Sequence, residues 1–114
     1  MKDTITEKLT LSDLTSGANW IHLAVENSDF DAINSVKKEE LLCIDHDCES
    51  PLHYAAANND VEMCKILLEK QPKLLNMKCS DDKTAYELAL SYKDEYNSHI
   101  DVCNYFLGLT FDKN

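Results

Sequence analysis

The chain has 114 residues and a formal net charge of −10 at pH 7, and hydrophobic residues make up 44% of it. This apolar content is ordinary for one folded domain. All eleven basic residues are lysine. Nucleic-acid binding normally uses a basic surface, often with arginine forks for phosphate or guanine, so this composition argues against it.

The sequence also bears on where the chain resides. No apolar run approaches the length of a membrane-spanning helix, and residues 1–7 lack the apolar core of a signal peptide. An odd number of cysteines favours a reduced, intracellular protein without structural disulfides; they are Cys43, Cys48, Cys64, Cys79 and Cys103. We therefore expect a cytoplasmic chain, although a chain delivered into a host cell by a dedicated bacterial secretion system would fit the same pattern.

The first fourteen residues are interpreted as an N-terminal cap. Thr4 and Glu7 have the spacing of a helix capping box, and Ile5 and Leu9 fall on one face of a helix. The alternative is a frayed terminal tail without a role.

A first pair of helices is predicted at 20–27 and 30–38. The second of these has an apolar stripe at helical spacing, formed by Phe30, Ile33 and Val36. Asp29 stands where it can cap that helix. Leu41, Leu42 and Ile44 then return the chain to the core.

A second pair is predicted at 51–58 and 61–70. Ser50 is a good N-cap, because its hydroxyl can accept hydrogen bonds from the first free N–H groups of the helix. Pro51 suits the first helical position, where no amide hydrogen is needed. The second helix carries the stripe Val61, Cys64, Leu67 and Leu68, and Pro72 marks its exit.

A third pair is predicted at 84–92 and 99–107, and Gly108 is expected to stop the last helix before a tail at 109–114. Thr84 lies 34 positions after Ser50, whereas Ile100 lies 39 positions after Val61, so about five residues are inserted at 91–98. The insertion either extends the inner helix by a turn or forms a longer loop. It lies on a binding face or is an idiosyncrasy of the last repeat.

A helix pair of this size cannot bury its apolar faces alone, so we expect it to stack on copies of itself. The three predicted pairs are interpreted as such copies. The central copy reads Ser50-Pro51-Leu52-His53-Tyr54-Ala55, which resembles the S/T-P-L-H-x-A pattern of the ankyrin repeat. The first copy keeps His22 and Ala24. The third keeps Thr84 and Ala89 but has Glu87 in place of histidine. The resemblance covers about residues 13–108.

The resemblance implies an all-α helical repeat solenoid, in which stacked helix–turn–helix pairs are joined by hairpin-like turns. A single domain would span 1–114, with a cap at 1–14 and repeats at 15–44, 45–78 and 79–108. The family has glycines at the positions of Cys48 and Asn59. The first position often needs φ > 0, which costs a residue with a Cβ, and asparagine tolerates that conformation better.

The sequence predicts no enzyme and no cofactor. The resemblance implies that His22 and His53 are structural, bonding within and between turns. Cys43, His46, Cys48 and Cys79 could form a metal site, but their spacing matches no common zinc pattern. Free thiols in a reduced protein explain them better.

The resemblance places partner binding on a concave face, made of the hairpin tips and the exposed positions of the inner helices. The positions carried over are Thr15, Ser16, Ala18, Glu26 and Asn27 in repeat one, His46, Asp47, Glu49, Ala57 and Asn58 in repeat two, and Ser80, Asp81, Lys83, Ser91 and Tyr92 in repeat three. Tyr92 is the expected aromatic anchor.

Two functions fit this reading. One is a protein-interaction module, a small adaptor or regulator that binds a partner with a basic surface and is monomeric when unbound. The alternative is a dedicated acidic inhibitor, such as an immunity protein or nucleic-acid mimic, that blocks a basic enzyme surface. The repeat family favours the first, and the small size and charge favour the second.

Overall fold

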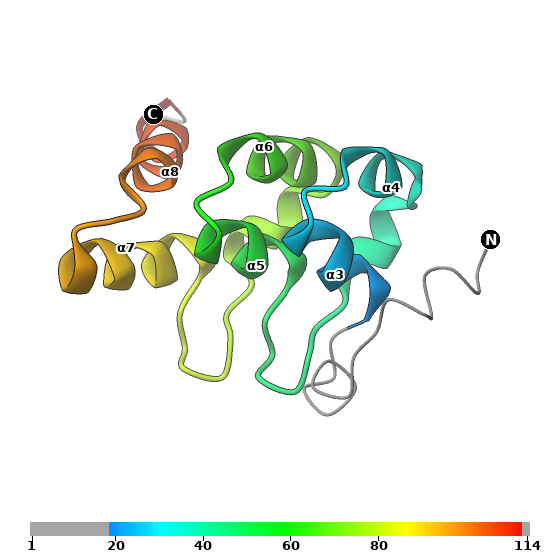
Figure 1. The fold of residues 1–114 in the computed structure, drawn as a ribbon, viewed down its shortest axis with the longest axis horizontal. Coiled ribbons are helices and arrows are strands. Elements are labelled where there is room, and N and C mark those ends of the chain that lie inside the picture. The colour runs from blue at the N-terminus through cyan, green and yellow to red at the C-terminus, as the bar shows by residue number, and fades with distance from the viewer. Residues whose placement is uncertain (1–18, 113–114) are drawn as a thin grey trace.

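The computed structural model describes residues 19–112 (Figure 1). Six α-helices and two short 3-10 helices follow one another, with no strand among these residues. In chain order they are α3 (Trp20–Glu26), α4 (Phe30–Ser35), η1 (Lys38–Leu42), α5 (Pro51–Ala57), α6 (Val61–Lys70), η2 (Pro72–Asn76), α7 (Ala85–Tyr96) and α8 (Ile100–Asp112). The predicted cap at 1–14, with Thr15, Ser16 and Ala18, lies outside the described residues.

The helices form two layers. Figure 1 shows α3, α5 and α7 in one row and α4, α6 and α8 in a second row above it. Two narrow loops extend from the inner row, away from the outer row. We call residues 45–49 the first finger and residues 79–83 the second finger. Of the helices described, none is both long and apolar enough to span a bilayer.

The hydrophobic core runs through all three repeats between the two rows. Its largest members are fully buried, among them Ile33, Leu52, Leu67 and Phe106. Small residues line the inner helices, including Ala55, Ala56 and Ala85, and let the helices approach closely. Trp20 is half-buried and packs against this core.

Each inner helix begins with a capping box. Asn19, Ser50 and Thr84 are the N-caps, and each forms a capping box with the residue three positions later. In the third repeat that residue is Glu87, whose Oε1 accepts a 2.9 Å hydrogen bond from the N–H of Thr84. Glutamate therefore replaces the capping function of histidine at this position.

Three helix ends differ from the sequence prediction by more than one residue. The outer helix expected at 30–38 ends at Ser35, because Val36 is extended and the chain turns into η1, which buries Leu41. The inserted residues extend α7 to Tyr96, where Asn97 ends the helix in a left-handed conformation. Gly108 does not stop α8, which continues to Asp112 while Leu109 packs against the core.

Among residues 19–112, six residues other than glycine adopt positive φ angles, and most of them lie in turns between helices. Cys48 has φ = 61° and Asn59 has φ = 55°, as expected at these positions. Asp82, at the corresponding turn of the second finger, has φ = 63°. The chain thus keeps the backbone of glycine turns without the glycines, at some cost in conformational energy.

Candidate partner-binding surface

The first finger is built around Asp45. Its backbone N–H donates to the carbonyl of Glu49 (3.1 Å), and its Oδ1 accepts from the N–H groups of Asp47 and Glu49, both at 2.9 Å. Asp45 itself is buried, with only 6% of its surface exposed. Burial of this carboxylate is possible because it accepts several hydrogen bonds.

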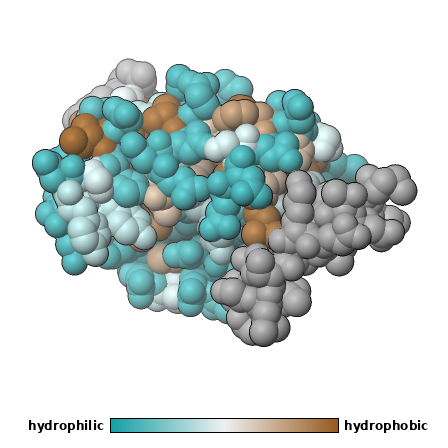
Figure 2. Space-filling view, viewed as in Figure 1, coloured by the Kyte–Doolittle hydropathy of each residue, from teal (hydrophilic) through white to brown (hydrophobic). Residues whose placement is uncertain are grey.

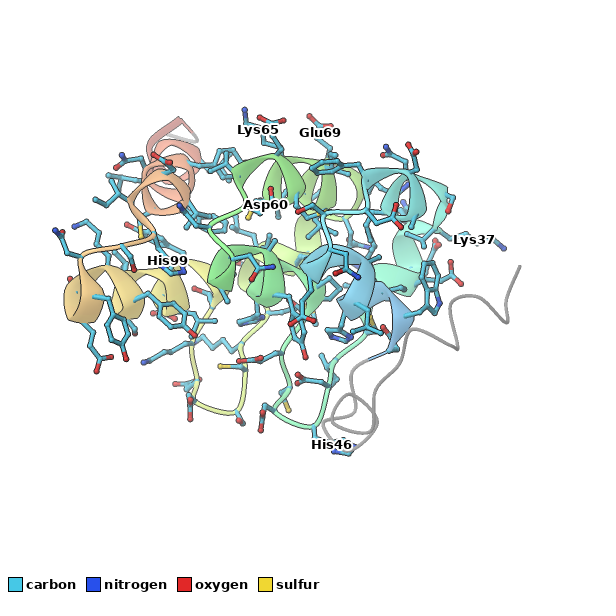
Figure 3. All side chains as sticks on the ribbon, in the orientation of Figure 1. Lys37, His46, Asp60, Lys65, Glu69 and His99 are labelled. Carbon is cyan, nitrogen blue, oxygen red and sulfur yellow. The ribbon has the colours of Figure 1, made fainter. Side chains whose placement is uncertain are left out.

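The second finger repeats this backbone and contacts the first. Cys79 N–H donates to the carbonyl of Lys83 (2.9 Å), and Ser80 N–H donates to the carbonyl of Asp47 (2.8 Å). The two fingers are thereby joined near their tips. His46, Asp47, Ser80 and Asp81 are all exposed there, and Figure 3 shows His46 at the far end of the first finger.

Two buried histidines position the fingers. Nδ1 of His22 accepts from the N–H of Asn19, so Nε2 carries the proton and donates to the carbonyl of Glu49 at 2.9 Å. His53 does the same between the N–H of Ser50 and the carbonyl of Lys83. Burial lowers the pKa of both imidazoles, against the opposing effect of these carbonyl bonds. The expected structural role of both histidines is confirmed.

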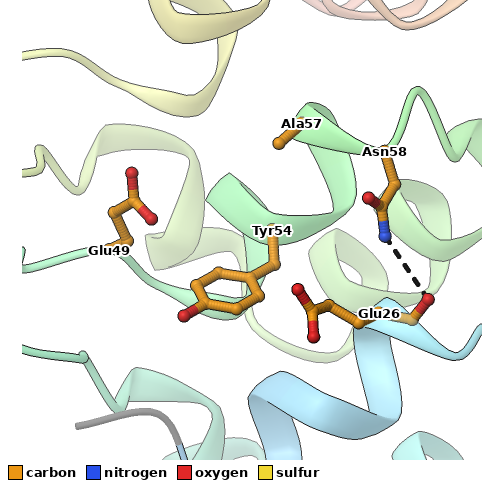
Figure 4. Close-up of a pocket in the computed structure, with 5 residues that line it drawn as sticks. All are labelled: Glu26, Glu49, Tyr54, Ala57 and Asn58. Carbon is orange, nitrogen blue, oxygen red and sulfur yellow. Dashed lines mark hydrogen bonds between the residues drawn. The ribbon is translucent and has the colours of Figure 1, made fainter. Parts of the chain in front are cut away.

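A pocket of about 200 Å³ opens between α3 and α5, lined by Glu26, Glu49, Tyr54, Ala57 and Asn58 (Figure 4). Four of these five residues are among the predicted binding positions. Tyr54 is not among them. It is half-buried, and it also forms a wall of the pocket.

Tyr54 is held in a fixed orientation. Its hydroxyl donates a 2.7 Å hydrogen bond to Oδ2 of Asp45, and its ring lies 4.6 Å from the His22 ring, centroid to centroid. Burial, followed by the bond to Asp45, raises the pKa of the phenol well above its usual value. Tyr54 therefore presents a neutral aromatic ring to the pocket.

Negative charge accumulates at this pocket. The pKa of Glu49 is raised by burial and then by the charges of Asp45, Asp47 and Asp81. Two salt bridges occur among the described residues, Lys65–Glu62 and Lys78–Asp82, and both join exposed side chains. Neither involves Glu49, Asp47 or Asp81. The pocket and the finger tips therefore form an acidic surface.

The third repeat contributes a more polar and aromatic area. Lys83 Nζ donates to Ser91 Oγ at 2.9 Å, so these two predicted binding residues contact each other. Tyr92 is half-buried and stacks on His99, with 4.6 Å between ring centroids. Tyr96, which the sequence prediction omitted, is 64% exposed. Its position depends on the helical conformation of the inserted residues, which the sequence left open between a helix and a loop.

The remaining predicted positions lie on this same side. Glu26, Asn27 and Asn58 are exposed at the ends of α3 and α5, and Asn58 Nδ2 donates to the Glu26 carbonyl at 3.5 Å. Hydrophilic side chains cover much of the face shown in Figure 2, and the apolar areas between them are small.

The residues considered above as a possible metal site do not form a cluster of ligands among the described residues. Within residues 19–112, no three His, Cys, Asp or Glu side chains lie close enough together to hold a metal ion. All five cysteines are free thiols. Burial raises the pKa of Cys43 and Cys64, which disfavours the thiolate that binds metals.

Comparison with known proteins identifies the repeat. A search of curated proteins finds no matching relative. The family model for ankyrin repeats, in three copies, matches residues 21–114, and ankyrin repeats are generally protein–protein interaction modules. The match agrees with the paired helices, the fingers and the histidines that bond to them, and the chain belongs to the ankyrin repeat family.

Proposed function

We propose that this protein binds a partner protein with a basic surface, and that it does so through its concave face. We use that term for the two fingers together with the exposed residues of α3, α5 and α7. The observation that carries the proposal is the gathering of Glu26, Glu49, Asp47 and Asp81 on adjacent elements of this face. Burial, followed by the charges of Asp45, Asp47 and Asp81, raises the pKa of Glu49. A cationic partner would relieve that repulsion.

The histidines support binding rather than catalysis. Both ring nitrogens of His22 and of His53 are committed to hydrogen bonds with the backbone. Burial keeps both imidazoles neutral near pH 7. A general acid or base needs a nitrogen directed at a substrate, and these two have none to spare.

A dedicated inhibitor is the second candidate, and the net charge of −10 on a small domain favours it. An acidic protein that covers a basic active site gains its fast association from the same charges. An adaptor would leave the activity of its partner intact. We further propose that the chain works as a monomer in the cytoplasm, where its five free thiols would stay reduced.

The test is the kinetics of binding to a partner captured from the source cell. Asp47→Lys/Asp81→Lys reverses two exposed finger charges, and Glu62→Lys/Glu69→Lys makes the same charge change on α6, on the opposite side of the molecule (Figure 3). The finger variant should associate about tenfold more slowly at low salt and show a flatter salt dependence. If the α6 variant loses binding and the finger variant does not, the partner uses the other face.

The two candidate functions separate in one further measurement. At a one-to-one molar ratio to a captured enzyme, this protein should abolish the enzyme's activity if it is an inhibitor. It should leave that activity unchanged if it is an adaptor. The same finger variant should then lose inhibition and association together.

A further inference from the structure

The pocket between α3 and α5 combines an aromatic ring with two carboxylates. Figure 4 shows the ring of Tyr54 between the side chains of Glu26 and Glu49, with Ala57 on the helix above them. Alanine at that position leaves the space open, because it has no side chain beyond Cβ. The volume of about 200 Å³ is that of a single side chain rather than of a large ligand.

The aromatic wall of this pocket is held in place before any ligand binds. Tyr54 is held by its hydrogen bond to Asp45 (2.7 Å) and by its contact with the His22 ring. Asn58 bonds to the backbone carbonyl of Glu26 and so links the end of α5 to the end of α3. A preorganised pocket loses little conformational entropy on binding, which favours affinity.

The electrostatics of the pocket select a cation. The pKa of Glu49 is raised by burial and by three neighbouring aspartates, because like charges lie close to its half-buried carboxylate. Glu49 takes no part in either salt bridge among residues 19–112, which are Lys65–Glu62 and Lys78–Asp82. A positive group in the pocket would pair with Glu49 in a site partly shielded from water, where ion pairs are stronger than at an open surface.

We propose that this pocket receives an arginine side chain of the partner protein, an inference that rests on the proposed binding function. A guanidinium group is planar, stacks on aromatic rings and pairs with carboxylates through two parallel hydrogen bonds. A lysine ammonium has no plane to stack on Tyr54. The chain contains no arginine of its own, so neither it nor a second copy can supply this group.

The experiment is a titration of the full ¹⁵N-labelled chain with the peptide acetyl-Gly-Arg-Gly-amide, followed by NMR. The amide signals of Ala57 and Asn58 should shift in a saturable way, with a Kd of roughly 1 mM. The same peptide with citrulline, which is neutral and nearly isosteric, should give no saturable shift. The lysine peptide should bind at least about fivefold more weakly.

Matched variants locate the site. Glu26→Gln/Glu49→Gln keeps the size of both side chains and should weaken the arginine peptide about tenfold. Glu62→Gln/Glu69→Gln makes the same charge change on α6 and should leave its Kd unchanged. Tyr54→Leu removes the ring and should also weaken binding, and the glutamine variants decide the matter if that protein fails to fold.

Three outcomes would overturn the inference: no saturable shift, equal binding of the arginine and lysine peptides, or equal weakening by the two glutamine double variants. None of them would touch the broader proposal, because association of the captured partner depends on Asp47 and Asp81 at the finger tips. Conversely, arginine binding in the pocket without any effect of the finger charges on partner association would sustain this inference and remove the proposed mode of partner binding.

Discussion

The hydroxyl of Tyr54 donates a 2.7 Å hydrogen bond to Oδ2 of Asp45 and thereby ties α5 to the first finger. The other oxygen of Asp45 accepts from the backbone N–H groups of Asp47 and Glu49. One buried carboxylate thus shapes the finger and fixes the aromatic wall of the pocket.

Tyr54→Phe should therefore destabilise the protein although it removes a single oxygen. The variant leaves Oδ2 of the buried Asp45 without this donor, which should lower the free energy of unfolding by about 1–2 kcal/mol. Urea denaturation measures the change. Tyr96→Phe is the matched control, because Tyr96 is 64% exposed and its loss should have little effect. Equal effects of the two variants would contradict the role assigned to Asp45.

The finger turn offers a stabilising substitution. Cys48 has φ = 61°, where a Cβ is strained and glycine is not, so Cys48→Gly should raise the free energy of unfolding by about 0.5–1 kcal/mol. Cys79→Gly is the control, because Cys79 is buried and has no positive φ; that variant should lose stability. A loss of stability in Cys48→Gly would show that the thiol contributes more than the turn costs.

The buried histidines predict how stability depends on pH. Burial lowers the pKa of His22 and His53 in the folded state below the ordinary value of about 6.5. The unfolded chain therefore binds more protons, so this part of the stability is present above pH 6.5 and is lost as pH falls below it. Urea midpoints at pH 7.5 and pH 5.5 should show the decrease.

A His53→Gln variant is the companion measurement. It should be less stable at pH 7.5, because the bond to the Lys83 carbonyl is altered, and its stability should depend less on pH over the same interval. A steeper dependence in the variant would mean that other groups control the transition.

A substitution in the hydrophobic core should lower the free energy of unfolding more than the changes above. Leu52 is fully buried in α5, between the repeats on either side. Leu52→Ala should cost about 2–5 kcal/mol, because it leaves a cavity that neighbouring helices fill only partly. Leu107→Ala, at a position 40% exposed, should cost much less. Similar unfolding midpoints for these two variants would contradict the packing described.

Local signals in the sequence were sufficient for most of the fold. The Ser50–Pro51 start and the stripe at 61–68 predicted α5 and α6 at their observed positions, because caps and apolar spacing act within one helix. The end of α4 at Ser35 and the passage of α8 through Gly108 could not be read in this way. Both depend on whether Leu41 and Leu109 reach the core, and that is decided by residues distant in the sequence.

The candidate site was predicted in its outline but not in its detail. The repeat pattern placed Glu26, Glu49, Ala57 and Asn58 on the surface that carries the pocket. It missed Tyr54, because a pocket between two repeats has no signature within either of them. The burial of Asp45 has no local signature either: an aspartate in a turn is normally exposed, and only the three donors around it make burial possible.

The aromatic residues of α7 should differ in their effect on partner binding. Tyr92 stacks on His99, whose Nε2 lies 2.6 Å from the carbonyl oxygen of Ala57, so Tyr92→Ala loosens the junction of α7 and α8 as well as the surface. Tyr96 is exposed beside it, with 6.3 Å between the ring centroids. Exposed aromatic residues are frequent anchors of interfaces and act mainly on dissociation. Tyr96→Ala should therefore speed dissociation of the captured partner about tenfold, with association and the urea midpoint unchanged. Tyr92→Ala should speed dissociation too and lower the urea midpoint. Unchanged dissociation in Tyr96→Ala would confine the interface to the fingers and the pocket between α3 and α5.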